Sequence, residues 1–298
     1  MKISLLTALR YAWDNRAKIA SHEGYAAYLR RIAARPDAAY WAKNSAGAGA
    51  YPDGPDGGWR YDFTRLPAHD QLLDTYKLNA VAGQGDTLKR ALRVMDWLTA
   101  HTLYNGMEVR ACYLFQGKRE ETPRILRYAR DGGFLRAVNC RHKAIALADC
   151  LLAVGVAAMP LGLWSYTYRP GEEIVTPMPN HYVVQLWLPE ERRWVMFDPS
   201  FNAYVTDATE RALHLAEIQA AHRAGETLRA AKYDFNGTQD CRETYLDGFI
   251  LGSLLEITAC DGSRRMDDFR NHLLPEDVPQ KEKRMITLTE LLAEPKNI

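Results

Sequence analysis

Three residue types that together perform acyl transfer follow one another along this chain of 298 residues. Cys140 opens a long apolar run, His181 lies in an alternating apolar segment, and Asp198 ends the next such segment. In this chemistry a thiolate attacks a carbonyl carbon, a histidine accepts the thiol proton, and a carboxylate orients the histidine ring. The residue types and their order therefore predict a nucleophile, a base and an orienting acid.

A helix has to present Cys140 for this chemistry. Residues 140–154 are apolar almost all round, which predicts a buried central helix that ends before Gly155. At the start of such a helix, the backbone N–H groups and the helix dipole stabilise a thiolate, and the same N–H groups can form half of an oxyanion hole. The alternative is a structural cysteine, because cysteine is among the residue types most often buried.

A β-hairpin has to bring His181 to Asp198. The turn that follows Leu188 pairs this residue with Arg193, and the same register puts Val183 opposite Asp198. His181 is two residues from Val183, so it shares a sheet face with Asp198 and is its diagonal neighbour. We therefore expect a hydrogen bond between the two side chains. Taken singly, they are a half-buried strand histidine and a carboxylate at a strand end.

A metal site competes for Cys140, His142 and Cys150. The chain has no Cys-x-x-Cys pair and no His-Glu-x-x-His segment, which are spacings typical of zinc sites. Cys150 lies about 280° round the helix axis from Cys140, so the two thiols do not converge on one ion. We therefore expect no metal and no cofactor, and we expect His142 at the surface of the first helical turn.

The remaining elements are predicted from periodicity and turn residues. The first 35 residues predict two helices, one with an apolar stripe from Leu5 to Trp13 and one with a stripe from Tyr25 to Ile32. Residues 45–58 are dense in Gly, Pro and Asp, which favours a linker or surface loop, with a flap over the active site as the alternative. Further helices are predicted at 86–104, where Asp86 is the cap, and at 208–224. Strands are predicted at 156–169, 181–188, 193–198 and from Phe249 to Cys260.

Charge and cysteine content exclude several classes of partner. The formal net charge is +1, with 38 basic and 37 acidic residues. Proteins that bind nucleic acids or membrane surfaces usually carry an excess of basic residues, and this chain does not. No apolar stretch is long enough to span a membrane. The five cysteines are scattered and odd in number, which argues against a disulfide framework and favours a reducing cytoplasm.

Three segments resemble the transglutaminase-like superfamily of papain-fold cysteine enzymes. That family pattern has a cysteine on a helix, a histidine followed by an aromatic residue on a strand, and a Trp-x-x-x-Asp-Pro segment on the next strand. The resemblance covers roughly residues 86–260, and Asn139 departs from it, because many members carry a small residue there. The matching segments run from Asn139 to Val156, from Asn180 to Val184 and from Trp194 to Asn202.

The resemblance implies an α+β fold. In it, a central helix that carries Cys140 packs on an antiparallel sheet that carries His181 and Asp198, as in the papain-like and transglutaminase-like core. Residues 1–65 would be a helical N-terminal extension with the Gly/Pro-rich loop, and residues 66–298 the transglutaminase-like catalytic domain.

The resemblance also implies the roles of the site residues. Cys140 would be the nucleophile, His181 the base and Asp198 the orienting acid. No motif fixes the second oxyanion donor, and Tyr104 and Asn105, at the end of the helix before the cysteine region, are the candidates. The chain lacks the acidic cluster of calcium-regulated members, so no calcium dependence is expected.

The expected function is cysteine acyl transfer on an amide or ester carbonyl through a thioester on Cys140, which an amine or water resolves. The substrate would be a peptide, a protein or a small acyl compound, and the resemblance does not separate an amide-forming acyltransferase from a peptidase. The alternative is a catalytically inactive papain-like module that binds peptides or partner proteins. Three tryptophans on the expected strands, Trp164, Trp187 and Trp194, are interpreted as core residues, with a cleft lining as the alternative.

Overall fold

The computed structural model describes residues 5–33, 63–107, 122–130, 133–166, 177–251, 256–259 and 291–295. They form an α+β fold on one six-stranded antiparallel sheet of order β5-β4-β3-β2-β1-β6, so the predicted class is confirmed. The strands are β1 (Ala158–Tyr166), β2 (Pro177–Leu188), β3 (Arg193–Asp198), β4 (Ala203–Thr206), β5 (Arg229–Lys232) and β6 (Glu256–Ala259). The helices are α1 (Leu5–Asp14), α2 (Arg16–Ile19), α3 (His22–Ala33), α5 (Pro67–Tyr76), α6 (Leu78–Ala82), α7 (Thr87–His101), α9 (Thr122–Arg130), η1 (Gly133–Arg136), α10 (Cys140–Ala153), α11 (Leu215–Ala224), α12 (Arg242–Tyr245) and the π-helical turn η2 (Leu246–Ile250). The predicted loop at 45–58, with Cys112 and Cys260, lies outside the described residues.

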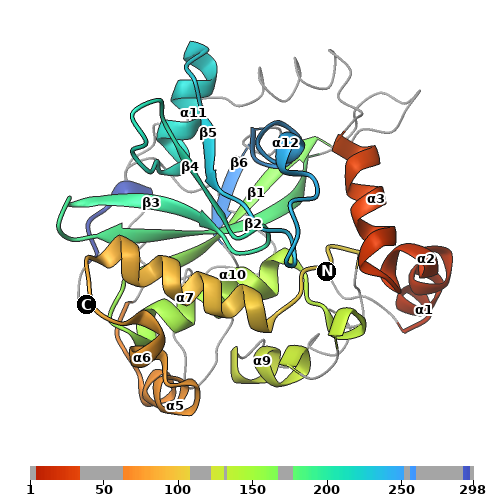
Figure 1. Ribbon diagram of the computed structural model, residues 1–298, viewed down its shortest axis with the longest axis horizontal. Coiled ribbons are helices and arrows are strands. Elements are labelled where there is room, and N and C mark those ends of the chain that lie inside the picture. Colours follow the sequence, from red (N-terminus) through yellow and green to blue (C-terminus); the bar gives the residue numbers. More distant parts are fainter. Residues whose placement is uncertain are drawn as a thin grey trace, which may run out of the picture.

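Helix α10 is the central helix that the apolar run predicts. Asn139 caps its start, because its side-chain oxygen accepts the backbone N–H of His142 at 3.1 Å. Gly155 follows its end with φ at 78°, a left-handed conformation that glycine adopts without strain. The helix packs on β1 and β2, with α5, α7 and α9 on its other sides (Figure 1).

The β2–β3 hairpin has the predicted register. Leu188 pairs with Arg193, and Val184 pairs with Phe197. Continued by one residue, this register puts Val183 opposite Asp198, which is the position that the prediction requires.

A β-bulge precedes His181 on the other side of β2. Leu163 pairs with His181, but Trp164 pairs with Pro179, so Asn180 is an extra residue in β2. A bulge bends its strand and changes the direction of the neighbouring side chains.

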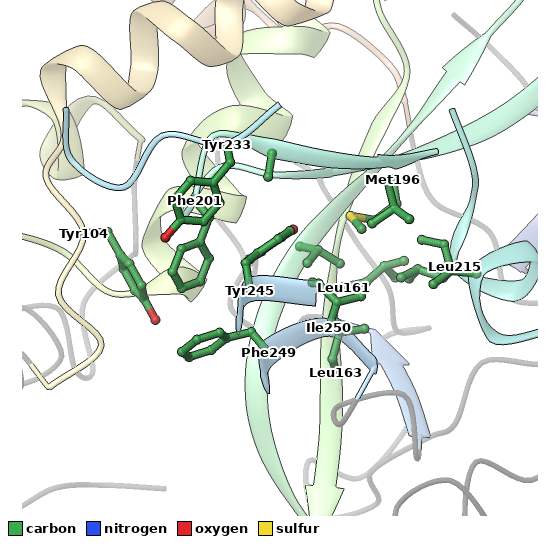
Figure 2. Close-up of a cluster of buried hydrophobic side chains, with 14 of the residues drawn as sticks. Tyr104, Leu161, Leu163, Met196, Phe201, Leu215, Tyr233, Tyr245, Phe249 and Ile250 are labelled. Atoms are coloured by element: carbon green, nitrogen blue, oxygen red, sulfur yellow. The ribbon is translucent and has the colours of Figure 1, made fainter. Parts of the chain in front are cut away.

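The sheet separates two hydrophobic clusters. Val184, Leu186 and Phe197 pack under α10 together with side chains of α5, α7 and α9. Val183 and Met196, whose side chains alternate with these, pack in the second cluster with residues of α11, α12 and η2. Figure 2 shows that aromatic rings gather at one end of this second cluster and aliphatic side chains at the other.

The tryptophans on β2 and β3 are core residues. Trp187 and Trp194 are both buried in the second cluster, with ring centroids 5.5 Å apart. The interpretation as core rather than cleft lining is therefore confirmed for these two.

Three helices, rather than the predicted two, begin the chain, because α2 forms a separate short turn between α1 and α3. The predicted apolar stripe of α1 is exposed, with Leu6 at 79% and Trp13 at 69% of full exposure. On α3, by contrast, Tyr25 and Leu29 are buried at 2% each. Only the second predicted stripe is therefore a core face.

Helix α7 is close to its prediction. The structure starts it at Thr87 and ends it at His101, three residues before the predicted end. Asp86 caps it, as predicted, by accepting the backbone N–H of Lys89 at 2.8 Å.

The strand predicted from Phe249 to Cys260 is wrong over its first residues. Phe249 belongs to η2, and β6 starts only at Glu256. Tyr245 and Phe249 stand four residues apart and both meet Phe201, at ring-centroid distances of 5.1 and 4.9 Å. In a helix, residues four apart stand one above the other, so both rings reach one neighbour, whereas in a strand they would lie about 13 Å apart.

The helix predicted at 208–224 begins later, at Leu215. Asp207 accepts hydrogen bonds from two backbone N–H groups downstream, at 2.9 and 3.1 Å, and holds a turn there. His214 and Glu217 then cap the helix reciprocally, each side chain accepting the other residue's backbone N–H. Among the described helices, none has the length and apolar character that a membrane crossing requires.

Candidate active site

Cys140 stands at the first position of α10, where the sequence placed it. Its N–H group has no acceptor inside the helix, as for every residue of a first helical turn. Most of α10 packs in the first cluster, which lies between this helix and the sheet. Cys140 instead packs against the second cluster, on the other face of the sheet. The partly exposed Cys140 therefore reaches the sheet face of His181 from the start of α10, whereas Cys150 of the same helix is fully buried.

His181 contacts both other predicted site residues. It is 1% exposed, and its Nε2 lies 2.7 Å from Oδ2 of Asp198. The predicted hydrogen bond between these two side chains is therefore confirmed. The thiol of Cys140 lies close enough to the His181 ring to raise its pKa, and because Nε2 faces Asp198, Nδ1 is the ring nitrogen left for the sulfur.

The charge state of His181 follows from these neighbours. Burial lowers its pKa, but the charge and hydrogen bond of Asp198, together with the contact to Cys140, outweigh burial and raise the pKa from 6.5 to about 10. The imidazolium is therefore the stable form at neutral pH. An imidazolium beside a thiol stabilises the thiolate, which is the nucleophilic form of cysteine.

Asp198 is fully buried and has three hydrogen-bond donors. Oδ2 accepts from His181 and from the hydroxyl of Tyr245 at 3.2 Å, and Oδ1 accepts the backbone N–H of Ser200 at 2.9 Å. Burial above all, and then Asp198 itself, raises the pKa of Tyr245 well above its usual value, so its hydroxyl remains a donor. The carboxylate is thus held in one orientation by groups from three segments.

Sequence reasoning missed Tyr245. It lies 47 residues beyond Asp198, and it carries no motif. Only its place in an aromatic run of a segment that returns to the sheet distinguishes it, and that signal does not identify its partner.

Lys143 is the second residue that sequence reasoning missed. It follows Cys140 by one helical turn, is 1% exposed, and donates from Nζ to the carbonyl of Thr102 at 2.5 Å. Burial lowers its pKa to about 7, although the charges of Asp198 and Asp234 act in the opposite direction. A lysine inside an otherwise apolar helix was the available signal.

Tyr104 is the oxyanion candidate that the structure brings to the site. Asn236 fixes its backbone with two hydrogen bonds, from Tyr104 N–H to Oδ1 at 2.7 Å and from Nδ2 to the Tyr104 carbonyl at 2.9 Å. Its ring meets the His181 ring edge to face, at 6.5 Å between centroids. Burial first, and then the neighbouring Tyr25 and Cys140, raise the pKa of Tyr104 well above its usual value, so the hydroxyl stays protonated.

Asn105, the other candidate, uses its amide elsewhere. Its Nδ2 donates to the carbonyl of Ile19 at 3.4 Å, and its Oδ1 accepts the backbone N–H of Met107 at 2.9 Å. Its own N–H donates to the carbonyl of Val138 at 2.9 Å. These bonds hold the segment that carries Tyr104.

In the described part of the chain, no three His, Cys, Asp or Glu side chains lie close enough together to hold a metal ion. The prediction that His142 lies at the surface is wrong, because it is 1% exposed. Burial first, and then the charge of Arg141, lower the pKa of His142 to about 3. The segments that pack around α10 cover this turn, and helical periodicity alone does not reveal them.

No family model matches this chain, and comparisons with curated proteins and with solved structures find no match either. The resemblance to transglutaminase-like enzymes therefore stays a prediction from the three sequence segments.

Proposed function

We propose that this chain is a cysteine-dependent acyltransferase or hydrolase with a transglutaminase-like, papain-fold core. One observation carries the proposal. A thiol at the start of a buried helix lies beside a histidine, whose Nε2 is 2.7 Å from a buried carboxylate. A nucleophile, a base and an orienting acid in this order are the parts that acyl transfer requires.

The first half of the reaction forms a thioester. The Cys140 thiolate attacks the carbonyl carbon of an amide or ester, a C–S bond forms, and the carbonyl oxygen becomes an oxyanion. The N–H of Cys140 and the hydroxyl of Tyr104 donate to this oxyanion. As the oxyanion collapses, the His181 imidazolium gives its proton to the leaving amine or alkoxide.

The second half releases the acyl group. Neutral His181 takes a proton from an amine or a water molecule, which attacks the thioester carbon, and the C–S bond breaks to restore the thiolate. Asp198 holds the ring in one tautomer in both halves and stabilises the imidazolium. Amide formation and hydrolysis share the thioester, so the proposal covers both acceptors.

The test is acylation by an activated ester. The protein is incubated with p-nitrophenyl acetate, digested, and mapped by mass spectrometry. We expect an acetyl group on the Cys140 peptide, and we expect a primary amine or hydroxylamine to remove it. Acetylation of surface lysines alone, or of all cysteines at one rate, would instead support the inactive papain-like binding module.

A further inference from the structure

Helix α3, near the start of the chain, reaches the candidate active site through Tyr25. The rings of Tyr25 and Tyr104 meet edge to face, with centroids 5.9 Å apart and planes at 83°. The backbone N–H of Gly106 donates to the Tyr25 hydroxyl at 2.9 Å. The two tyrosine hydroxyls also lie close enough for each to shift the pKa of the other.

Gly106 makes room for these hydroxyls. A Cβ atom at this position would lie 2.5 Å from the hydroxyl oxygen of Tyr25 and 2.8 Å from that of Tyr104. Both distances are shorter than a carbon atom tolerates, so any larger residue would displace the pair. Two buried hydroxyls thus converge on one backbone position that only glycine permits.

Packing fixes the helix that carries Tyr25. The ring of His22 stacks on Phe235 at 5.0 Å between centroids. Ala26 is fully buried, and its carbonyl accepts a hydrogen bond from the thiol of Cys241 at 3.8 Å. Tyr25 is therefore held from both sides along its own helix.

The hydrogen bonds can run in one direction toward the reacting carbonyl. At rest Tyr104 is the donor of the hydroxyl pair, because, after the larger effect of burial on both groups, their contact raises the pKa of Tyr104 and lowers that of Tyr25. When an oxyanion forms beside Cys140, the Tyr104 hydroxyl turns to it, and Tyr25 Oη, which accepts the Gly106 N–H, gives its own proton to Tyr104 Oη. A chain of donors polarised in this way strengthens the last hydrogen bond of the chain.

We infer that Tyr25 is a positioning residue that aims the Tyr104 hydroxyl at the oxyanion formed on Cys140. The inference rests on the proposed function, and it makes the N-terminal helices a component of the site. In this role Tyr25 acts through Tyr104 and does not itself donate to the oxyanion.

Two reactions of Cys140 separate this role from activation of the thiol. Acylation by p-nitrophenyl acetate passes through an oxyanion, whereas alkylation by iodoacetamide forms none. Tyr104→Phe should slow acylation by about 10²-fold, in the range found when one oxyanion donor is removed. Tyr25→Phe should slow acylation by roughly 2- to 8-fold, because the hydrogen-bond chain loses its first link, and with it about 10–30% of the strength of the last hydrogen bond, but keeps its last donor.

The double variant tests whether Tyr25 acts through Tyr104. Residues that act as one unit are not additive, so Tyr25→Phe/Tyr104→Phe should acylate no more slowly than Tyr104→Phe. All three variants should alkylate at the wild-type rate. Tyr233→Phe is the matched control, because it removes a hydroxyl of the same aromatic cluster that donates to the carbonyl of Asp240, and it should leave both rates unchanged.

Gly106→Ala gives a second route to the same test. Its methyl group displaces both hydroxyls, so it should also slow acylation and leave alkylation unchanged. Wild-type acylation in Tyr25→Phe, or additive losses in the double variant, would overturn the inference about Tyr25. Failure of Cys140 to react selectively in the wild type would instead overturn the proposed function.

Discussion

Two buried histidine–aspartate pairs lie beside α10, and they differ in what they contact. At its start, His181 Nε2 lies 2.7 Å from Asp198 Oδ2. In its second half, Asp149 Oδ1 lies 3.8 Å from Nε2 of His69 on α5. All four residues are at most 1% exposed.

The second pair connects helices. His69 Nδ1 accepts the backbone N–H of Leu66 at 3.0 Å, at the start of α5, and Asp149 Oδ2 accepts the hydroxyl of Thr122 on α9 at 2.5 Å. The first pair instead meets a thiol. Under the proposed function, only the pair that meets a thiol is catalytic, and the other pair is structural.

The cysteines of α10 provide the largest test of this contrast. Cys140→Ala should abolish acylation and turnover while the protein stays folded, because a methyl group cannot attack but fits the first helical turn. Cys150→Ala should retain the chemistry and lose some stability through a small cavity. The measurements are ester turnover and denaturant unfolding, and equal losses of turnover in the two variants would contradict the assignment of Cys140.

The two aspartates provide the next test. In Asp198→Asn, the amide can present N–H to the ring, which favours the wrong tautomer of His181. We expect turnover to drop on the order of 10²-fold, less than in serine enzymes because a thiolate–imidazolium pair needs less help from the base. Folding should be nearly unaffected.

Asp149→Asn is the matched control on the other pair. It should leave turnover unchanged and lower the free energy of unfolding by about 1–3 kcal/mol, because a buried hydrogen-bond network loses its charged acceptor. A slow Asp149→Asn enzyme beside a wild-type-like Asp198→Asn enzyme would reverse the roles given to the two pairs.

The titration of His181 sharpens the contrast further. Its pKa is raised to about 10, so the ring should stay protonated through neutral pH and lose its proton only as the pH rises through that value. In Asp198→Asn the largest raising cause is gone and burial still lowers the pKa, so the proton should be lost at a lower pH. Ring ¹⁵N NMR of the two proteins measures this, and an unchanged titration would show that Asp198 does not set the charge of the ring.

The sequence predicts the hairpin and α10 because their signals are local. The turn after Leu188 fixes the pairing with Arg193, and that register determines which face His181 and Asp198 share. Asn139 and Gly155 mark the ends of α10 by cap chemistry that needs no tertiary context.

The rest depends on contacts between distant segments. Tyr25 and Tyr245 reach the site from α3 and α12, and no local sequence pattern identifies the residues that they contact there. The sequence predicts a strand at Phe249 because short apolar runs fit both the strand and the helix period, and burial of its ring against Phe201 favours the helical period. It predicts His142 at the surface because helical periodicity does not show what packs over a first turn.

The most direct test of the account is the rate at which iodoacetamide alkylates each cysteine at neutral pH, followed by mass spectrometry. Burial above all raises the pKa of Cys150 well above its usual value and that of Cys241 to about 11, so both should react slowly. We expect Cys140 to react at least about 10²-fold faster than either, more slowly in Asp198→Asn, and at the wild-type rate in Asp149→Asn. Equal labelling of Cys140 and Cys150, or equal slowing in the two aspartate variants, would contradict a nucleophile activated by His181 and Asp198.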